Sequence, residues 1–178
     1  MKAVMMSIQP KWCELIASGK KTIEVRKTRP KLETPFKCYI YQTKKAWLYD
    51  IYSVIAGWQR KVIGEFNCYG IIEYDYNSDG YGIREEDRLC YLSCLTPKEL
   101  YHYLQGDKCY GWCFDNLVIY DEPKELSSFY RPCPYEDNDD ISCYLCDKSG
   151  RRPDDANLDC FYFCEKPPQS WYYVEELV

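Results

Sequence analysis

The stretch LIASGKKTIEVRK, residues 15–27, contains the end of a predicted helix followed by a predicted strand. The helix begins at Pro10, because proline is favoured in the first helical turn, and Gly19 occupies the position after the helix end, where glycine is common. The remainder of the stretch alternates between apolar and polar side chains, which is the pattern of a half-buried strand. This alternation places Glu24 and Arg26 on one face of the strand, about 7 Å apart.

The rest of the chain predicts further strands and one more short helix. Thr96 with Glu99 forms a capping box and Pro97 opens the helix, which we expect over residues 97–105. Residues 77–89 are expected to be a polar loop. The other predicted strands lie at 2–8, 36–43, 62–76 (with bulges at Gly64 and Gly70), 112–121 and 170–177. Five or six strands interrupted by two short helices predict an α+β fold built on a small β-barrel.

The strand and turn carry the pattern Gly19-x-Lys21-x-x-Glu24-x-Arg26, which resembles the signature of the ASCH family, a branch of the PUA-like superfamily. Other segments that resemble small stand-alone bacterial members of this family are the first strand and helix, GWCFDNLVIYDEPKELSSF at 111–129 and PQSWYYVEEL at 168–177. The resemblance implies a PUA-like β-barrel with a cleft around the motif, and this cleft is generally proposed to bind RNA.

The motif is the candidate binding site for RNA or for a modified nucleoside. A basic side chain at Lys21, beside a carboxylate that can accept from a base or sugar, suits a pocket for one nucleotide. The alternative is that Glu24 and Arg26 pair with each other as part of the barrel wall. Trp112 and Trp171 are candidate stacking platforms, although aromatic residues in a tyrosine-rich barrel more often belong to the core. The candidate ligand-binding residues are Gly19, Lys20, Lys21, Glu24, Arg26, Trp112 and Trp171.

The resemblance also raises the alternative of an enzyme on the same scaffold. It implies that some relatives remove the acetyl group of N4-acetylcytidine, using a lysine, a threonine three residues later and a distant glutamate, and that others are associated with ribonuclease activity. Lys21 matches the lysine, whereas Glu24 stands where the threonine is expected. If the chain is a hydrolase, Lys21 and Glu24 are the candidate catalytic residues.

Five of the 12 cysteines are crowded into residues 131–164, an acidic, turn-rich segment with few aliphatic residues. We interpret this segment as an insertion in the ASCH/PUA-like barrel formed by residues 1–130 and 165–178. Cys143-x-x-Cys146, with 13 residues before the next cysteine, resembles zinc-ribbon spacing, and structural zinc would stabilise a segment without its own core. The predicted zinc ligands are Cys133, Cys143, Cys146 and Cys160, with Cys164 in reserve. Unbound thiols or a redox pair are the alternatives.

The distribution of charge and hydropathy along the chain indicates which kinds of partner the protein has. Residues 1–45 hold 11 Lys and Arg against 3 Asp and Glu, a balance of +8, whereas the remainder carries −13. This asymmetry favours a basic face for an anionic partner such as RNA. The sequence has no apolar run long enough to span a membrane and no secretory leader, so we expect a cytoplasmic protein without a membrane partner. A protein-interaction module that uses the cysteine-rich insertion is a further alternative.

Overall fold

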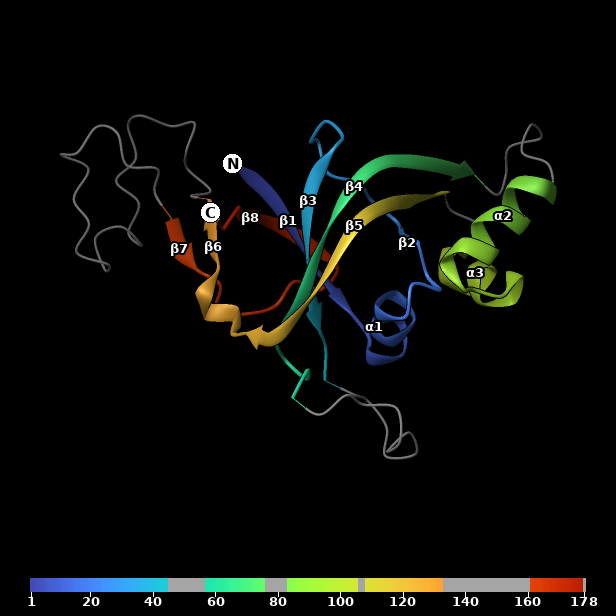
Figure 1. The fold of residues 1–178 in the computed structure, drawn as a ribbon. Helices are drawn as coiled ribbons and strands as arrows, with labels where there is room; N and C mark the ends of the chain where they lie inside the picture. The colour runs from blue at the N-terminus through green and yellow to red at the C-terminus, as the bar shows by residue number, and fades with distance from the viewer. Residues whose placement is uncertain (45–56, 76–82, 106–107, 133–160, 178) are drawn as a thin grey trace.

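The structure is a computed structural model that describes residues 1–44, 57–75, 83–105, 108–132 and 161–177. Its main feature is a six-stranded mixed sheet with the strand order β2-β5-β4-β3-β1-β8 (Figure 1). The elements are β1 Lys2–Ile8, α1 Pro10–Ala17, β2 Ile23–Arg26, β3 Phe36–Gln42, β4 Val62–Asp75, α2 Ile83–Ser93, α3 Pro97–Leu104, β5 Lys108–Lys124, the 3-10 helix η1 Leu126–Ser128, β6 Tyr130–Pro132, β7 Phe161–Phe163 and β8 Trp171–Glu175. β1 and β3 run parallel, and the other neighbouring pairs of the sheet are antiparallel.

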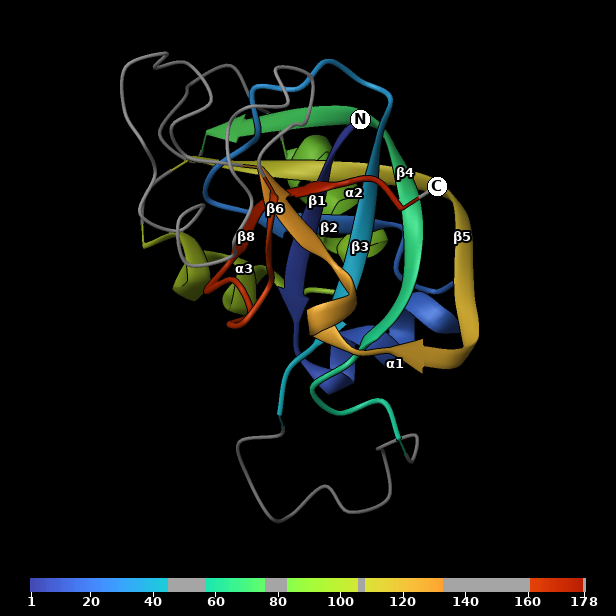
Figure 2. The same ribbon diagram turned by 90° about the vertical axis from the view of Figure 1, so that its left-hand side faces the viewer.

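The sheet is open, so the closed barrel expected from the sequence is wrong in this respect. Among the described strands, β2 pairs only with β5 and β8 pairs only with β1. β4 and β5 curve strongly, so the sheet wraps partly around itself (Figure 2). Side chains bridge the gap between β2 and β8, which we call the seam: Trp171 Nε1 donates to Thr28 Oγ1 at 2.9 Å, and Arg26 Nη1 donates to Ser170 Oγ at 3.4 Å. Side chains therefore occupy the place where a backbone ladder would close the barrel.

Three register shifts against β5 accompany the curvature of β4, one of them between Glu65 and Asn67. Its register against β5 shifts between Val62 and Gly64 and again between Cys68 and Gly70, which confirms the bulges predicted at the two glycines. At Gly64 a side chain is also excluded by space, because a Cβ atom there would collide with the carbonyl oxygen of Val118. Bulges bend a strand and increase its twist, which fits the wrapped shape of the sheet.

α2 packs against β2 and α3, whereas α1 contacts β3. α3 begins with the predicted capping box, in which the Thr96 side chain accepts from the Glu99 N–H and the Glu99 carboxylate accepts from the Thr96 N–H. The loop expected over 77–89 is wrong from residue 83 on, since Ile83–Ser93 forms α2, and residues 77–82 lie outside the described residues. This helix has a polar beginning, and it is stabilised by burial of Leu89 in an apolar cluster with Ile23 of β2.

β6 and β7 form a separate antiparallel pair in which Pro132 lies opposite Phe161. Residues 161–163 are extended, as a run of three aromatic residues favours. Cys164 is 1% exposed and packs against Phe129 in the core, with its N–H bonded to the Phe129 carbonyl at 2.9 Å. The other four predicted zinc ligands, Cys133, Cys143, Cys146 and Cys160, lie outside the described residues. Within the described ranges, no group of three or more candidate metal ligands is found.

The remaining expectations for secondary structure hold with small shifts of boundary. The closing strand expected at 170–177 is Trp171–Glu175, and the strand expected at 112–121 is longer, at Lys108–Lys124. None of the helices in the described part of the chain has the length and apolar character that crossing a membrane requires.

Candidate functional site

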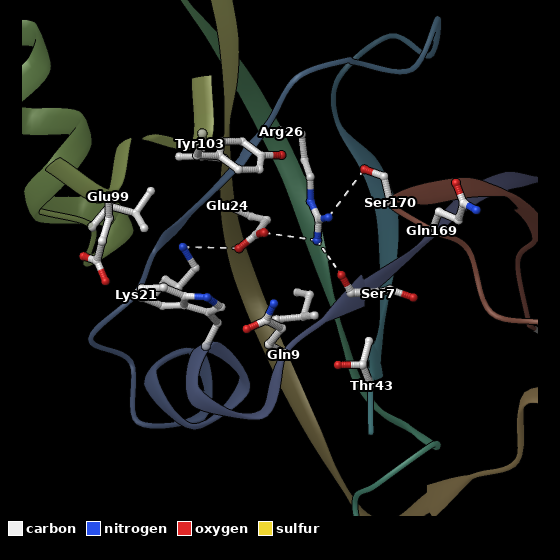
Figure 3. Close-up of a pocket in the computed structure, with 14 residues that line it drawn as sticks. Ser7, Gln9, Lys21, Glu24, Arg26, Thr43, Glu99, Tyr103, Gln169 and Ser170 are labelled. Carbon is white, nitrogen blue, oxygen red and sulfur yellow. Dashed lines mark hydrogen bonds and ion pairs between the residues drawn. The ribbon is translucent and has the colours of Figure 1, made fainter. Parts of the chain in front are cut away.

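A cavity of about 490 Å³ opens beside the seam, and the motif side chains form its charged wall (Figure 3). Lys21, Glu24 and Arg26 line it from β2 and the turn before β2. Val25 of β2 also lines the cavity. The other lining residues come from β1 and the residue after it, α1, α3, the segment before β8 and two loops: Ser7, Ile8, Gln9, Trp12, Thr43, Leu95, Glu99, Tyr103, Gln169 and Ser170. The cavity therefore lies where the open edge of the sheet meets two helices.

The turn between α1 and β2 fixes the position of Lys21. Gly19 adopts φ +72° after the helix, as its predicted place requires, and the Lys21 N–H donates to the Leu15 carbonyl at 3.0 Å. The next residue is also held, because the Thr22 N–H donates to the Leu92 carbonyl of α2 at 2.9 Å. These backbone bonds turn the Lys21 side chain toward the interior, where it is 2% exposed.

The Lys21 ammonium lies among oxygen atoms. Nζ donates to the main-chain carbonyl of Ile23 at 2.9 Å and to that of Ser93 at 2.8 Å. It also lies 3.2 Å from Glu24 Oε2 and 5.2 Å from the centre of the Trp12 ring. A charged ammonium is thus compensated by two carbonyl dipoles, a carboxylate and an aromatic face.

Glu24 lies between two cations. Its Oε1 is 3.1 Å from Arg26 Nη2, while its Oε2 faces the Lys21 ammonium. Oε2 is buried and accepts no hydrogen bond of good geometry from any described residue, so the contact with Lys21 is an ion pair by distance only. Burial of one carboxylate with two cations leaves a net formal charge of +1 in this part of the cavity.

Arg26 connects β2 to β1 across the seam. Its Nη2 donates to the Ser7 carbonyl at 2.7 Å, and its Nη1 reaches Ser170 Oγ at 3.4 Å. Its Nε is buried and finds no acceptor in the part of the chain that the structure describes. The guanidinium group lies in the centre of the close-up of the cavity, with Glu24 on one side and Ser170 on the other (Figure 3).

Two lining residues of α3 have pKa values that reflect their surroundings. Hydrogen bonds from the backbone and side chain of Thr96 lower the pKa of the Glu99 carboxyl, and Lys11, at 3.3 Å, lowers it further. Burial raises the pKa of the Tyr103 hydroxyl, although the Arg26 charge opposes this rise. At neutral pH the rim therefore offers an ionised carboxylate and a neutral phenol.

The structure brings together three of the predicted ligand-binding residues, Lys21, Glu24 and Arg26. Gly19 and Lys20 are exposed on the neighbouring turn and do not line the cavity. Trp112 and Trp171 do not line it either. Trp112 is fully buried in the core, with its ring 5.7 Å from that of Phe36 and 5.8 Å from that of Trp171, and Trp171 donates its N–H to Thr28.

Sequence reasoning missed the aromatic and acidic residues that complete the cavity, notably Trp12, Glu99 and Tyr103. Glu99 and Tyr103 are four residues apart in α3 and therefore share one face of that helix. This spacing was visible in the sequence, but the position of α3 against the motif depends on tertiary packing. Trp12 lies in the helix predicted from Pro10, and a tryptophan in a short helix is by itself no signal of a binding site.

The open mixed sheet, with three helices and the motif cavity at one edge, defines an α+β fold of the PUA-like kind. The chain belongs to the ASCH domain family, because the family model of the ASCH domain matches residues 6–145. The structure is similar to that of ASCH from Zymomonas mobilis, with a TM-score of 0.52 and 19% identity over 98% of this chain and 88% of the other. The S128A mutant of the same protein has a TM-score of 0.52 and 18% sequence identity, over 98% of this chain and 89% of the other. At this identity the likeness concerns the fold. A comparison with curated proteins found no match.

Proposed function

We propose that this ASCH domain binds RNA by taking one nucleotide, or a modified nucleoside, into the cavity beside the seam. The observation that carries the proposal is the buried row Lys21–Glu24–Arg26, which lines a cavity of about 490 Å³. ASCH domains are generally RNA-binding, and the motif is the part of the chain that most resembles the family. The proposal extends this general property to a particular site.

The chemistry of the cavity suits a nucleotide. Its volume lies within the roughly 300–1,000 Å³ of small-molecule sites. Arg26 presents hydrogen-bond donors and Glu24 a carboxylate acceptor from the same strand, and base edges carry both acceptors and donors. Tyr103 and Trp12 add aromatic surface to the walls, on which a base can stack.

Exposed cations lie along the loop that follows β2. Lys27, Arg29 and Lys31 are exposed there, and the loop is fastened to β8 by a hydrogen bond from the Lys31 N–H to the Tyr173 hydroxyl at 2.8 Å. A strand of RNA that leaves the cavity can therefore place its phosphates on this loop. The loop is already held to β8, so binding does not have to order it. Phosphate contacts of this kind give affinity that falls with salt and carry no sequence information.

Fluorescence anisotropy tests the proposal with labelled single-stranded and hairpin RNAs, at low and moderate salt. We expect wild type to bind with salt-sensitive affinity and the double variant Lys21→Ala/Arg26→Ala to lose this binding. A matched control is Lys98→Ala/Lys108→Ala, which removes the same charge from exposed positions that do not line the cavity. Equal losses in both double variants would refute the cavity as the site, because they would show a dependence on net charge alone.

Wild type and two further variants separate the alternative functions. Release of acetate from N4-acetylcytidine, or cleavage of RNA, that stops in Glu24→Gln would assign an enzyme. Absence of nucleic-acid binding, together with a protein partner that is lost when residues 134–163 are deleted, would assign a protein-interaction module.

We also propose that zinc stabilises the cysteine-rich segment through Cys133, Cys143, Cys146 and Cys160. Pairing of Pro132 with Phe161 supports this, because Cys133 follows the first of these residues and Cys160 precedes the second. Two of the four proposed ligands therefore flank the point at which β6 and β7 hold the chain together. Burial in the core, which raises the pKa of the Cys164 thiol, argues against that residue as the fourth thiolate ligand.

A further inference from the structure

The three buried charges of the cavity differ in how many of their hydrogen-bond donors are already used. An ammonium has three N–H donors and a guanidinium has five. Two of the Lys21 donors are committed to the carbonyls of Ile23 and Ser93, at 2.9 and 2.8 Å. The third interaction of Nζ is the ion pair with Glu24 at 3.2 Å, and the side chain is only 3% exposed. A ligand would have to displace Glu24 or a main-chain carbonyl to reach this ammonium.

Arg26 is in the opposite situation. The Nη2 donors meet the Ser7 carbonyl at 2.7 Å and Glu24 Oε1 at 3.1 Å. Nη1 makes a single contact of 3.4 Å with Ser170 Oγ, which is long for a hydrogen bond. Nε has no acceptor among the described residues. At least two of the five donors are therefore unsatisfied, and a buried charged donor without an acceptor costs free energy until one arrives.

From this count we infer that Arg26 is the residue that contacts the ligand, and that Lys21 is a positioning residue. Lys21 holds Glu24 in place and attaches β2 to the end of α2 through Ser93, while Glu24 orients the guanidinium of Arg26. This inference rests on the proposed function, because it assigns roles within the same cavity. It revises the interpretation of Lys21 as a direct ligand contact.

The ligand group that Arg26 meets is an oxygen acceptor. Nη1 lies on the side of the guanidinium that faces Ser170, where its single contact is the long one of 3.4 Å, so an oxygen entering the seam there can replace or share that contact. The oxygen can belong to a base carbonyl or to a phosphate, since a guanidinium recognises both. The two sources predict different responses to uridine, which has carbonyls and no phosphate, and to inorganic phosphate.

Proton–nitrogen correlation spectra of the wild-type protein test the assignment without a substitution. They detect the Nε–H of arginine and the ammonium of a buried, hydrogen-bonded lysine. We expect the Arg26 signal to shift on titration with single-stranded RNA, while the Lys21 signal stays at its position. A shift with uridine identifies a base carbonyl, and a shift with inorganic phosphate identifies a phosphate. A larger shift at Lys21 than at Arg26, or an unmoved Arg26 signal at saturating RNA, would overturn the inference.

The salt dependence of binding provides a second readout. Substitution of a residue that contacts phosphate changes this dependence, whereas substitution of a positioning residue does not. Loss of one phosphate contact reduces the slope of log affinity against log salt by about 0.7 for a single strand. We expect Lys21→Met to weaken RNA binding about tenfold, as for groups that orient a binding residue, with the slope unchanged. The comparison variant Lys27→Ala, at an exposed position near the rim, should reduce the slope.

Lys21→Met with wild-type affinity, or with the reduced slope of Lys27→Ala, would refute the positioning role. If Lys21→Met does not fold, the spectra of the wild type still decide between the two residues. Failure of the wild type to bind any RNA or nucleoside refutes the proposed function itself, which is a different outcome from binding that moves the wrong side chain.

Discussion

Arg26 of β2 donates from Nη2 to the main-chain carbonyl of Ser7 in β1, at 2.7 Å, although no backbone ladder joins these two strands. This bond, with the contact from Nη1 to Ser170, spans the seam of the open sheet. Arg26 is 8% exposed and ion-paired with Glu24, so the charge that faces the cavity also connects the two edges of the fold. The proposed binding and the stability of the fold would therefore depend on the same side chain.

We expect Arg26→Met to lower the free energy of unfolding by about 3 kcal/mol, because it leaves the Ser7 carbonyl and part of Glu24 without a donor. Urea denaturation measures this effect. Thr28→Val is a suitable control: it removes the other side-chain bond of the seam at an exposed position and should cost about 1 kcal/mol. Similar values for both variants would show that Arg26 contributes no more than a surface bond.

The pair Lys21 and Glu24 should behave as one coupled unit. Removal of either partner leaves the charge of the other buried without this partner, whereas removal of both leaves neither charge. We therefore expect the effects of Lys21→Met and Glu24→Gln on the free energy of unfolding to be strongly non-additive. A double-mutant cycle from urea denaturation should give a coupling energy above about 1 kcal/mol. Additive effects would mean that the 3.2 Å contact contributes little and that the two carbonyl bonds alone hold Lys21.

The motif is the part of the site that could be predicted from the sequence, because local rules determine it. Gly19 ends a helix, and strict alternation then sets the faces of Glu24 and Arg26, so both the turn and the strand follow from neighbouring residues. The cavity could not be predicted in full, since Ser7, Tyr103 and Ser170 reach it from elements distant in sequence. Their approach depends on how the sheet wraps and where α3 packs.

The two wrong predictions, a loop where α2 begins and a closed barrel, have related physical causes. Residues 83–88 are mostly charged, and only tertiary burial of Leu89 and Cys90 shows why this segment becomes helical. Closure of the barrel was expected from the number of strands, but strand number does not determine whether the last two edges pair. In this fold the buried charge of Arg26 occupies the space between those edges, and such an arrangement has no signature in hydrophobic periodicity.

The outer face of the sheet carries a network whose pH dependence can be measured. Burial raises the pKa of the Glu65 carboxyl, but the hydrogen bond from Tyr120 and the Lys37 ammonium at 3.0 Å lower it more, so the net shift is downward. A lowered carboxyl pKa stabilises the fold above the unfolded value of about 4.3 and loses this contribution as the pH falls through the folded value. Tyr120→Phe should therefore cost about 1 kcal/mol near pH 7 and less below pH 4. A cost that stays constant in acid, in urea denaturation, would contradict this assignment.

Buried cysteines should be protected from alkylation in the folded protein. Burial raises the pKa of the thiols of Cys68 and Cys109 to about 12, so at pH 8 almost none of either is the reactive thiolate. Iodoacetamide labelling followed by peptide mass spectrometry should leave both residues unmodified in buffer and modify both in urea. Cys94, which is less buried, provides an internal comparison and should react first among the described cysteines. Rapid labelling of Cys109 in buffer would show that α2 opens readily.

Zinc content tests the proposal for the cysteine-rich segment independently of RNA. We expect about one zinc per chain after gentle purification, because four thiolates complete a tetrahedral site. Cys143→Ser/Cys146→Ser should abolish this zinc, measured by elemental analysis, while the motif cavity and the proposed ligand binding remain, since none of the residues that line the cavity belongs to the segment 131–164. Cys164→Ser is the matched control: its thiol is buried against Phe129, so the substitution should lower the melting temperature and leave zinc bound. Loss of zinc in Cys164→Ser would move Cys164 into the ligand set, and less than about half an equivalent in the wild type would refute the site.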